Sequence, residues 1–279
     1  MRHLIDSFQS ATFRRAVLEA VVVGAIAGAA GAHVVLRRLP FFVVAISHAT
    51  FPGVVMASML GVSLFIGGTA FGFVVVAAVL VLGTANVLDD SSIIGVVLAG
   101  SFALGVLLLS TRPSSSRDLS AFLVGSVLTV TPADIFTTVA VGGVVLVALA
   151  AFHKELVLQA FDRGSAAALG YRTWVLDAVV LVAVTVIMVT AIPAVGTLLA
   201  VALLTVPALT ARLWCRRVGP MMMVGAGVGA ASGLIGLCAA AVWSVAAGGA
   251  IALAAGAFFV ATATLRRLFG ADSLRSDNR

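Results

Sequence analysis

The sequence predicts an all-α polytopic membrane protein with about nine transmembrane helices and one short additional helix on the outer side. Of its 279 residues, 62% are hydrophobic and only 10% are charged, whereas about a quarter of the residues of a soluble domain are charged. The mean hydropathy is +1.20, and many apolar runs approach the roughly 20 residues that a spanning helix needs. We therefore expect one transmembrane domain over residues 1–279, with a helical core from 14 to 267 and a polar C-terminal tail from 268 to 279.

Charged residues and turn signals divide the apolar sequence into nine predicted spans, at 16–36, 41–63, 66–84, 92–110, 135–152, 174–191, 194–210, 219–240 and 243–264. Arg14 and Arg15 before the first run imitate a signal peptide. Glu19 interrupts the would-be apolar core, however, and the run continues to Leu36. We interpret it as a membrane helix. The segment LSAFLVGSVLTV (119–130) is too short to span and is predicted to be a re-entrant or surface helix.

The orientation follows from the distribution of basic residues, which favour the cytoplasmic side. With the C-terminus inside, the inner loops hold most of the 17 basic residues, among them Arg37, Arg38, Lys154, Arg163 and Arg216. The net charge of +6 therefore reflects topology and requires no nucleic-acid partner.

The stretch VVAISHATFPGVV places His48 in an apolar run, four residues before Pro52. Proline lacks an N–H and repels the carbonyl four residues back, so Pro52 frees the carbonyl of His48. Ser47 lies beside it, and Gly53 allows a close approach or a local break. Imidazole is a common ligand of first-row transition metals, so this cluster suits a transient cation site on a transport path. A histidine packed against a neighbouring carbonyl is the structural alternative.

His33 lies on the other arm of the same predicted hairpin, four residues before Arg37. At about 1.5 Å of rise per residue, His33 and His48 would differ in depth by only a few ångströms. We place both on the candidate path, although packing alone is the simpler interpretation of His33 taken by itself.

Several other ionisable residues have local explanations. Glu19 is four residues after Arg15, the spacing of a helical ion pair. Asp89 and Asp90, and likewise Asp134, precede or open apolar runs, where acidic side chains suit a helix N-terminus. Asp177, near the inner membrane edge, is placed to reach Arg172.

The longest polar connection is HKELVLQAFDRGSAAALGYRT (153–173). Its first half predicts a short helix, and FDRGSAAALGY predicts a further turn or two that ends at Gly170. A simple connection would not need this much helix-forming sequence, so we interpret the loop as a docking surface for a cytoplasmic partner. An interfacial amphipathic helix is the alternative.

A second proline-containing run, GTLLAVALLTVPALTARL, lies in the other half of the chain. Pro207 would free the carbonyl of Leu203, close to Thr205. Paired proline-interrupted segments in two halves of a membrane protein are typical of a transport site near the midplane. A kinked packing helix is the alternative.

The chain contains no nucleotide-binding or catalytic motif. It has no G-x-x-x-x-G-K-[ST] sequence, its one lysine is Lys154, and it has no HExxH motif or nucleophile elbow. We therefore predict a non-catalytic transport subunit with no bound cofactor. Its energy would come from an ion gradient or from a separate ATPase that docks on 153–173.

These segments together resemble the permease subunits of bacterial ABC importers for manganese, zinc or iron. The matching pieces are GAHVVLRRLPFFVVAISHATFPGVV, LDDSSIIGVVLAGSFALGVLLLS, DLSAFLVGSVLTVTPAD, AFDRGSAAALGY and VGTLLAVALLTVPALTARL, in family order from about residue 14 to 267. The resemblance implies a type II ABC importer permease fold in the bacterial cytoplasmic membrane, with His48 as the family's path histidine. It also implies coupling residues at Phe161, Asp162, Arg163, Gly170 and Tyr171.

The same resemblance implies the partners. Two permeases would form a homodimer around one central pathway for the divalent metal, with ATP on a cytoplasmic ABC ATPase dimer. An extracytoplasmic metal-binding protein would deliver the metal, and the 119–130 helix would lie near the outer mouth.

One departure from the family concerns the metal site. The family usually carries a glycine and then an acidic residue four positions before the histidine, where this chain has Val43 and Val44. Our hypothesis is that His33, at a typically apolar position, partly compensates. A site with imidazole but no carboxylate favours zinc over manganese. The alternatives are a permease for chelated iron, haem or cobalamin, and a gradient-driven secondary metal transporter.

Overall fold

A computed structural model describes residues 10–84, 89–111 and 130–276. Within these ranges nine helices are long and apolar enough to cross a membrane, which confirms the predicted number. They are α2 (Ala11–Leu36), α3 (Pro40–Ala49) with α4 (Phe51–Leu60) as one span, α5 (Leu64–Gly83), α6 (Asp90–Ser110), α8 (Pro132–Ala151), α11 (Thr173–Val195), α12 (Thr197–Arg212), α13 (Val218–Trp243) and α14 (Ala247–Ser276). The predicted helix at 119–130 lies outside the described residues, apart from Val130.

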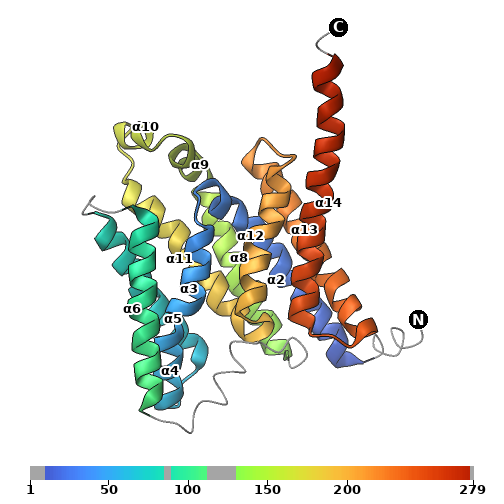
Figure 1. Cartoon of the computed structure of the whole chain (residues 1–279). Coiled ribbons are helices and arrows are strands. Elements are labelled where there is room, and N and C mark those ends of the chain that lie inside the picture. The colour runs from blue at the N-terminus through green and yellow to red at the C-terminus, as the bar shows by residue number, and fades with distance from the viewer. Residues whose placement is uncertain (1–9, 85–88, 112–129, 277–279) are drawn as a thin grey trace.

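The spanning helices stand side by side, and two short helices lie across one end of the bundle (Figure 1). These are α9 (His153–Phe161) and α10 (Arg163–Ala168), which join α8 to α11. Helix α2 begins at one end of the bundle and α14 ends at the other, as an odd number of crossings requires. Helix α14 continues to Ser276 and projects beyond its neighbours.

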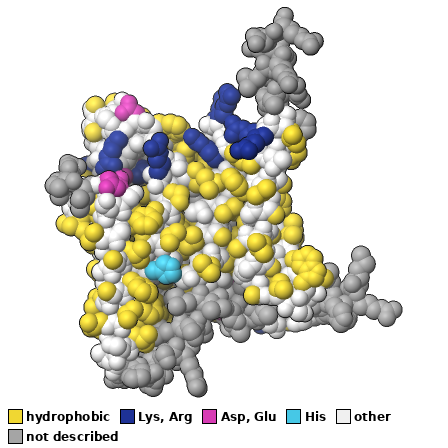
Figure 2. All heavy atoms as spheres, viewed as in Figure 1, with side chains coloured by type: hydrophobic (Ala, Val, Ile, Leu, Met, Phe, Trp, Pro, Cys, Tyr) yellow, Lys and Arg dark blue, Asp and Glu magenta, His cyan; other side chains and the backbone are white. Residues whose placement is uncertain are grey.

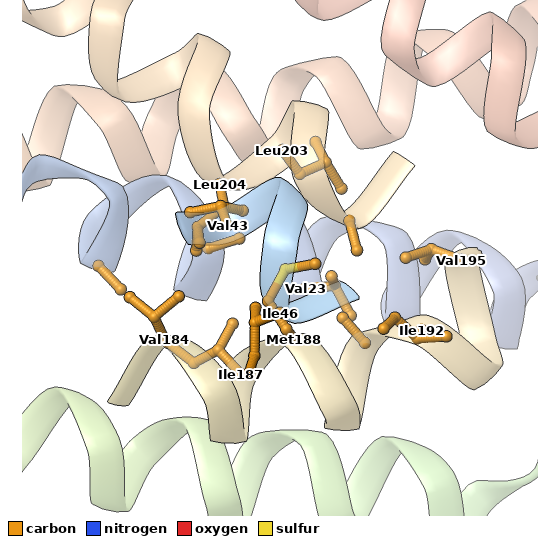
Figure 3. Close-up of a cluster of buried hydrophobic side chains, with 14 of the residues drawn as sticks. Val23, Val43, Ile46, Val184, Ile187, Met188, Ile192, Val195, Leu203 and Leu204 are labelled. Carbon is orange, nitrogen blue, oxygen red and sulfur yellow. The ribbon is translucent and has the colours of Figure 1, made fainter. Parts of the chain in front are cut away.

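The core lies between α2, α3, α11 and α12. Figure 3 shows apolar side chains from these helices interdigitating, including Val23, Ile46, Met188 and Leu203. The outer helices α5, α6, α8 and α14 instead leave large apolar side chains exposed along their length. Because lipid is the solvent for such side chains, the exposed apolar surface is what a membrane protein requires.

Glycines let α2 and α13 pack backbone to backbone. A Cβ added to Gly24 would lie 2.3 Å from the carbonyl oxygen of Gly229, and one added to Gly28 would lie 2.2 Å from that of Gly225. Helices in membranes associate through small residues at such four-residue spacings. Only glycine lets the axes of α2 and α13 come this close together.

The acidic residues that precede two spans cap them, as predicted. Asp89 accepts a hydrogen bond from the Ser92 N–H (3.2 Å) at the start of α6, and the Ser92 hydroxyl and N–H together lower the pKa of Asp89. At the start of α8, Thr131 and Asp134 form a reciprocal capping box.

The predicted pair of Glu19 with Arg15 is wrong. Arg15 is exposed at the beginning of α2, whereas Glu19 is completely buried against α8. There it accepts a hydrogen bond from the Thr138 hydroxyl (2.7 Å). Its second carboxyl oxygen is buried and has no partner among the described residues.

Candidate functional site

His48 lies on an apolar, partly exposed face of α3. Phe41, Val44 and His48 are spaced by three and four residues, so they share one side of the helix. Phe41 and Val44 are exposed and His48 is half-buried. The imidazole meets the ring of Phe102 from α6 edge to face, with 6.3 Å between centroids. The bilayer-spanning surface in Figure 2 carries a histidine among hydrophobic side chains.

This imidazole is deep in the span. His48 is eight residues after Pro40, the first residue of α3, which corresponds to about 12 Å along the helix axis. An ionisable side chain at such depth normally faces a protein interior or a water-filled path. The α3 face, defined by Phe41, Val44, His48 and Phe102, therefore carries a partly exposed ionisable side chain within the span.

The backbone is interrupted directly after His48. Helix α3 ends at Ala49, Thr50 is the cap, and α4 begins at Phe51 with Pro52 in its first turn. Because Pro52 has no N–H, the His48 carbonyl receives no helical hydrogen bond from residue 52. The Thr50 N–H reaches this carbonyl as well as that of Ile46. The span thus has, at His48, a backbone carbonyl without a hydrogen bond from residue 52 and an imidazole side chain.

Ser47 and Gly53 face the interior. The Ser47 side chain is buried, and its hydroxyl donates to the Val44 carbonyl (2.7 Å). A Cβ on Gly53 would lie 2.2 Å from the carbonyl oxygen of Gly67 in α5. Gly53 therefore allows the close packing of α4 on α5.

His33 has different neighbours from His48. It is only 1% exposed, and its ring meets that of His153, the first residue of α9, with 6.0 Å between centroids. Its Nε2 atom is buried without a hydrogen-bond partner in the described structure. Across the described residues, no group of three or more His, Cys, Asp or Glu is arranged to hold a metal ion.

The predicted helix break at Pro207 is wrong. Helix α12 runs without interruption from Thr197 to Arg212, with Pro207 buried inside it. The Thr205 hydroxyl donates to the Val201 carbonyl within the same helix (2.8 Å). The α11 and α12 spans are joined at Gly196, whose φ of 83° and ψ of 163° are accessible essentially to glycine alone.

The segment between α8 and α11 folds as two short helices, as predicted. Asp162 separates them and caps α10 by accepting from the Ser165 N–H (2.9 Å). The Ser165 hydroxyl and N–H also lower the pKa of Asp162. Gly170 follows α10 with φ 86°, and Phe161, Leu169 and Tyr171 are exposed. The segment thus presents apolar side chains at the polar end of the molecule.

A polar cluster that the sequence analysis missed attaches this segment to the membrane helices. Asp177 of α11 accepts hydrogen bonds from Arg37 (2.8 Å) and Arg163 (2.9 Å). It does not pair with Arg172, the neighbour expected from the sequence. Gln159 of α9 accepts from Arg37 (2.7 Å) and donates to Asp177 (2.9 Å). Burial lowers the pKa of Arg37, and the Asp177 carboxylate opposes this shift.

A signal for this cluster was present in the sequence. Asp177 is the one acidic residue in the opening turns of its span, and Arg37 directly follows the first span. Charges at the ends of adjacent spans are expected to find partners across the bundle.

Comparison with known proteins gives a consistent result. The model of the ABC 3 transport family matches residues 9–266. The manganese import system permease protein ScaB of Streptococcus gordonii is 33% identical over 247 residues, covering 88% of each chain. The zinc transport system membrane protein TroC of Treponema pallidum is 30% identical over 245 residues, covering 85% of this chain and 82% of TroC.

A solved structure, PsaBC from Streptococcus pneumoniae in complex with Fab, superimposes with a TM-score of 0.82 at 34% identity. The match covers 93% of this chain and 94% of the other.

Proposed function

Because this chain belongs to the ABC 3 transport family, we propose that it is the membrane subunit of an ATP-driven importer for a divalent transition-metal ion. Relatives named for manganese import and for zinc transport support this class of substrate. The protein would lie in a bacterial cytoplasmic membrane with its C-terminus inside. The metal is the cargo, and the chain itself needs no resident cofactor.

The observation that carries the proposal is the half-buried His48 imidazole on the otherwise apolar α3 face. In this proposal a second copy of the chain covers that face, and the two copies enclose one central pathway. A two-fold axis would bring two His48 side chains to opposite walls of the pathway. Ser47, buried beside His48, and His33, nearer the basic end of the bundle, are assigned to the same path.

Val44 shapes the chemistry of this path. It is exposed on the α3 face one turn from His48, so a carboxylate there would have shared the site. Without it, two imidazoles, water and the backbone carbonyl of His48 are the available ligands. The imidazoles in this set, without a carboxylate, favour zinc over manganese.

The energy would come from a cytoplasmic ABC ATPase dimer that docks on α9 and α10. The exposed Phe161, Leu169 and Tyr171 supply an apolar contact, and Arg163 supplies a charge beside it. On the opposite side of the membrane, an extracytoplasmic metal-binding protein would deliver the ion.

The test is metal accumulation in cells that express the chain with its neighbouring ATPase and binding-protein candidates. Manganese, zinc and iron are supplied separately as tracers, and the wild type is compared with His48→Ala. Thr137→Ala is the control, because it removes an exposed polar side chain from the α8 span, outside the α3 face and the α9–α10 segment.

We expect ATPase-dependent uptake of one metal that is lost with His48→Ala and retained with Thr137→Ala. Uptake without the ATPase would instead indicate a gradient-driven carrier. Uptake that needs the ATPase but survives His48→Ala would retain the importer and remove His48 from the path.

A further inference from the structure

A large basic cavity lies at the end of the bundle where α9 and α10 meet the hairpin between α2 and α3. Its volume is ≈ 690 Å³, and the ends of α5, α6, α11 and α12 complete its walls. Its charged lining residues are Arg37, Arg38, Arg163, Arg212, Asp90 and Asp177. Figure 2 shows the basic side chains gathered along this end of the molecule, with acidic ones among them.

The cavity has an excess of positive charge. Four arginines against two aspartates leave a net charge of +2. Asp177 is already shared between Arg37 and Arg163. Arg38 and Arg212 form no ion pair within the described ranges, so their charge is available to a ligand.

Arg37 supplies a second, independent observation. Its side chain is only 8% exposed, and its Nε atom is buried without a hydrogen-bond partner among the described residues. Buried donors are nearly always paired in native proteins. Because this nitrogen has no accessible surface, an acceptor in the cavity would reach it only after the Arg37 side chain turns toward the cavity.

The hairpin backbone also presents Arg38 to the cavity in an unusual conformation. Its φ of 58° lies in the left-handed region, which residues other than glycine and asparagine seldom adopt. The conformation is held by a hydrogen bond from the Leu39 N–H to the Val34 carbonyl (2.9 Å). Together with the hydrogen bond from the Arg38 N–H to the Val35 carbonyl (3.3 Å), this is the Schellman cap that ends α2, and it places Arg38 in the cavity wall.

The rest of the wall is apolar and reaches the depth of the membrane interface. Val79 and Leu80 come from the last turns of the α5 span, and Trp174, which is exposed, opens the α11 span. Tryptophan is typical of the interface between lipid and water. A ligand with phosphate oxygens at one end and apolar chains at the other matches both parts of the wall.

We propose that this cavity binds the phosphate-bearing headgroup of an anionic membrane lipid. Basic pockets between transmembrane helices commonly bind such headgroups. This site is separate from the proposed metal path, because it contains neither His48 nor any other residue of the α3 face. A soluble phosphate would share the arginine contacts but not the apolar wall.

The experiment uses the full-length chain purified in a mild detergent. Phosphatidylglycerol, phosphatidylcholine and inorganic phosphate are titrated separately, and the midpoint of thermal unfolding reports binding. The cavity variant is Arg38→Asn with Arg212→Gln, in which asparagine tolerates the left-handed backbone and the Asp177 contacts remain. The control is Arg216→Gln with Arg217→Gln, which removes the same charge from the exposed turn before α13.

We expect saturable stabilisation by phosphatidylglycerol alone. Its affinity should fall about thirtyfold in the cavity variant, roughly fivefold for each basic side chain removed, and less than threefold in the control. Equal affinities in the two double variants would overturn the site, and stabilisation by inorganic phosphate would overturn its assignment to lipid. If the cavity variant does not fold, Arg212→Gln alone should show the fivefold loss, and an unchanged affinity would overturn the proposal.

Discussion

Replacing Asp177 with alanine should destabilise the chain far more than replacing its exposed partner Arg163. Asp177→Ala removes the acceptor of both arginines and leaves Arg37 with a side chain that is 8% exposed and lacks its counter-ion. Breaking a buried ion pair from one side costs about 3–5 kcal/mol. Because Asp177 itself is 22% exposed, we expect about 3 kcal/mol.

Arg163→Ala removes a contact that is largely solvated, since the Arg163 side chain is 63% exposed. Such pairs contribute about 0–1 kcal/mol. The contact of Asp177 with the buried Arg37 should therefore contribute far more than its contact with Arg163. The expected difference in cost follows from the burial of the two arginines. The ion-pair distances cannot explain it, because Arg37 and Arg163 lie 2.8 and 2.9 Å from Asp177.

The assay is the free energy of unfolding of the purified chain in detergent micelles, measured for the wild type, Asp177→Ala and Arg163→Ala. A third variant, Arg37→Met with Asp177→Leu, replaces the pair with apolar side chains and should recover most of the loss. If Asp177→Ala cost no more than Arg163→Ala, the buried Arg37 would not depend on Asp177 and the reasoning would fail.

Three further predictions concern single side chains. Gly28→Ala should destabilise the chain by about 1–3 kcal/mol, because its Cβ would meet the Gly225 backbone. The control Gly95→Ala, with open space around the residue, should be neutral or stabilising. Equal unfolding free energies for the two variants would contradict the close approach of α2 and α13. Glu19→Gln should keep or raise the midpoint of thermal unfolding, because it retains the Thr138 hydrogen bond and removes a buried carboxylate with one unpaired oxygen. A clear fall in this midpoint would show that the carboxylate charge of Glu19 is stabilised by a partner. His33→Ala should lower metal uptake at normal expression, because the proposed path loses the His33 imidazole. Unchanged uptake would limit His33 to packing against His153.

The spanning helices were predictable because the bilayer imposes one simple constraint on each of them. A run of about 20 apolar residues has no other stable use in a membrane, and so the number of spans was confirmed. The caps at Asp89 and Asp134 depend on neighbours within one turn, and they too were predictable. These features are local, and the sequence contains everything that determines them.

The two prolines show where local reasoning fails. Pro52 lies at a helix interruption and Pro207 lies within an uninterrupted helix, although both would free the carbonyl four residues back. Close packing does not separate the two cases either, because a Cβ on Gly31 would lie 1.9 Å from the Leu204 carbonyl oxygen and one on Gly53 would lie 2.2 Å from that of Gly67. The turn at Gly196 between α11 and α12 depends on a backbone conformation that essentially only glycine adopts.

The interhelical contacts were not predictable from spacing alone. Glu19 and Asp177 each had a basic neighbour at a suitable distance in the sequence, but each is bonded to a residue more than a hundred positions away, Thr138 and Arg37 respectively. The glycines of α2 and α13 carried a readable four-residue pattern, which indicates a close helix pair without identifying the partner.

The Asp177 cluster provides a mechanical connection between α9–α10 and the helix that carries His48. One carboxylate oxygen accepts from Arg37, three residues before α3 begins, and the other accepts from Arg163 at the start of α10. A displacement of α10 must therefore move the α2–α3 hairpin or break the outer bond. In the proposed importer, Arg37→Met with Asp177→Leu would then restore stability but not ATPase-dependent uptake, and recovery of both together would limit the cluster to a structural role.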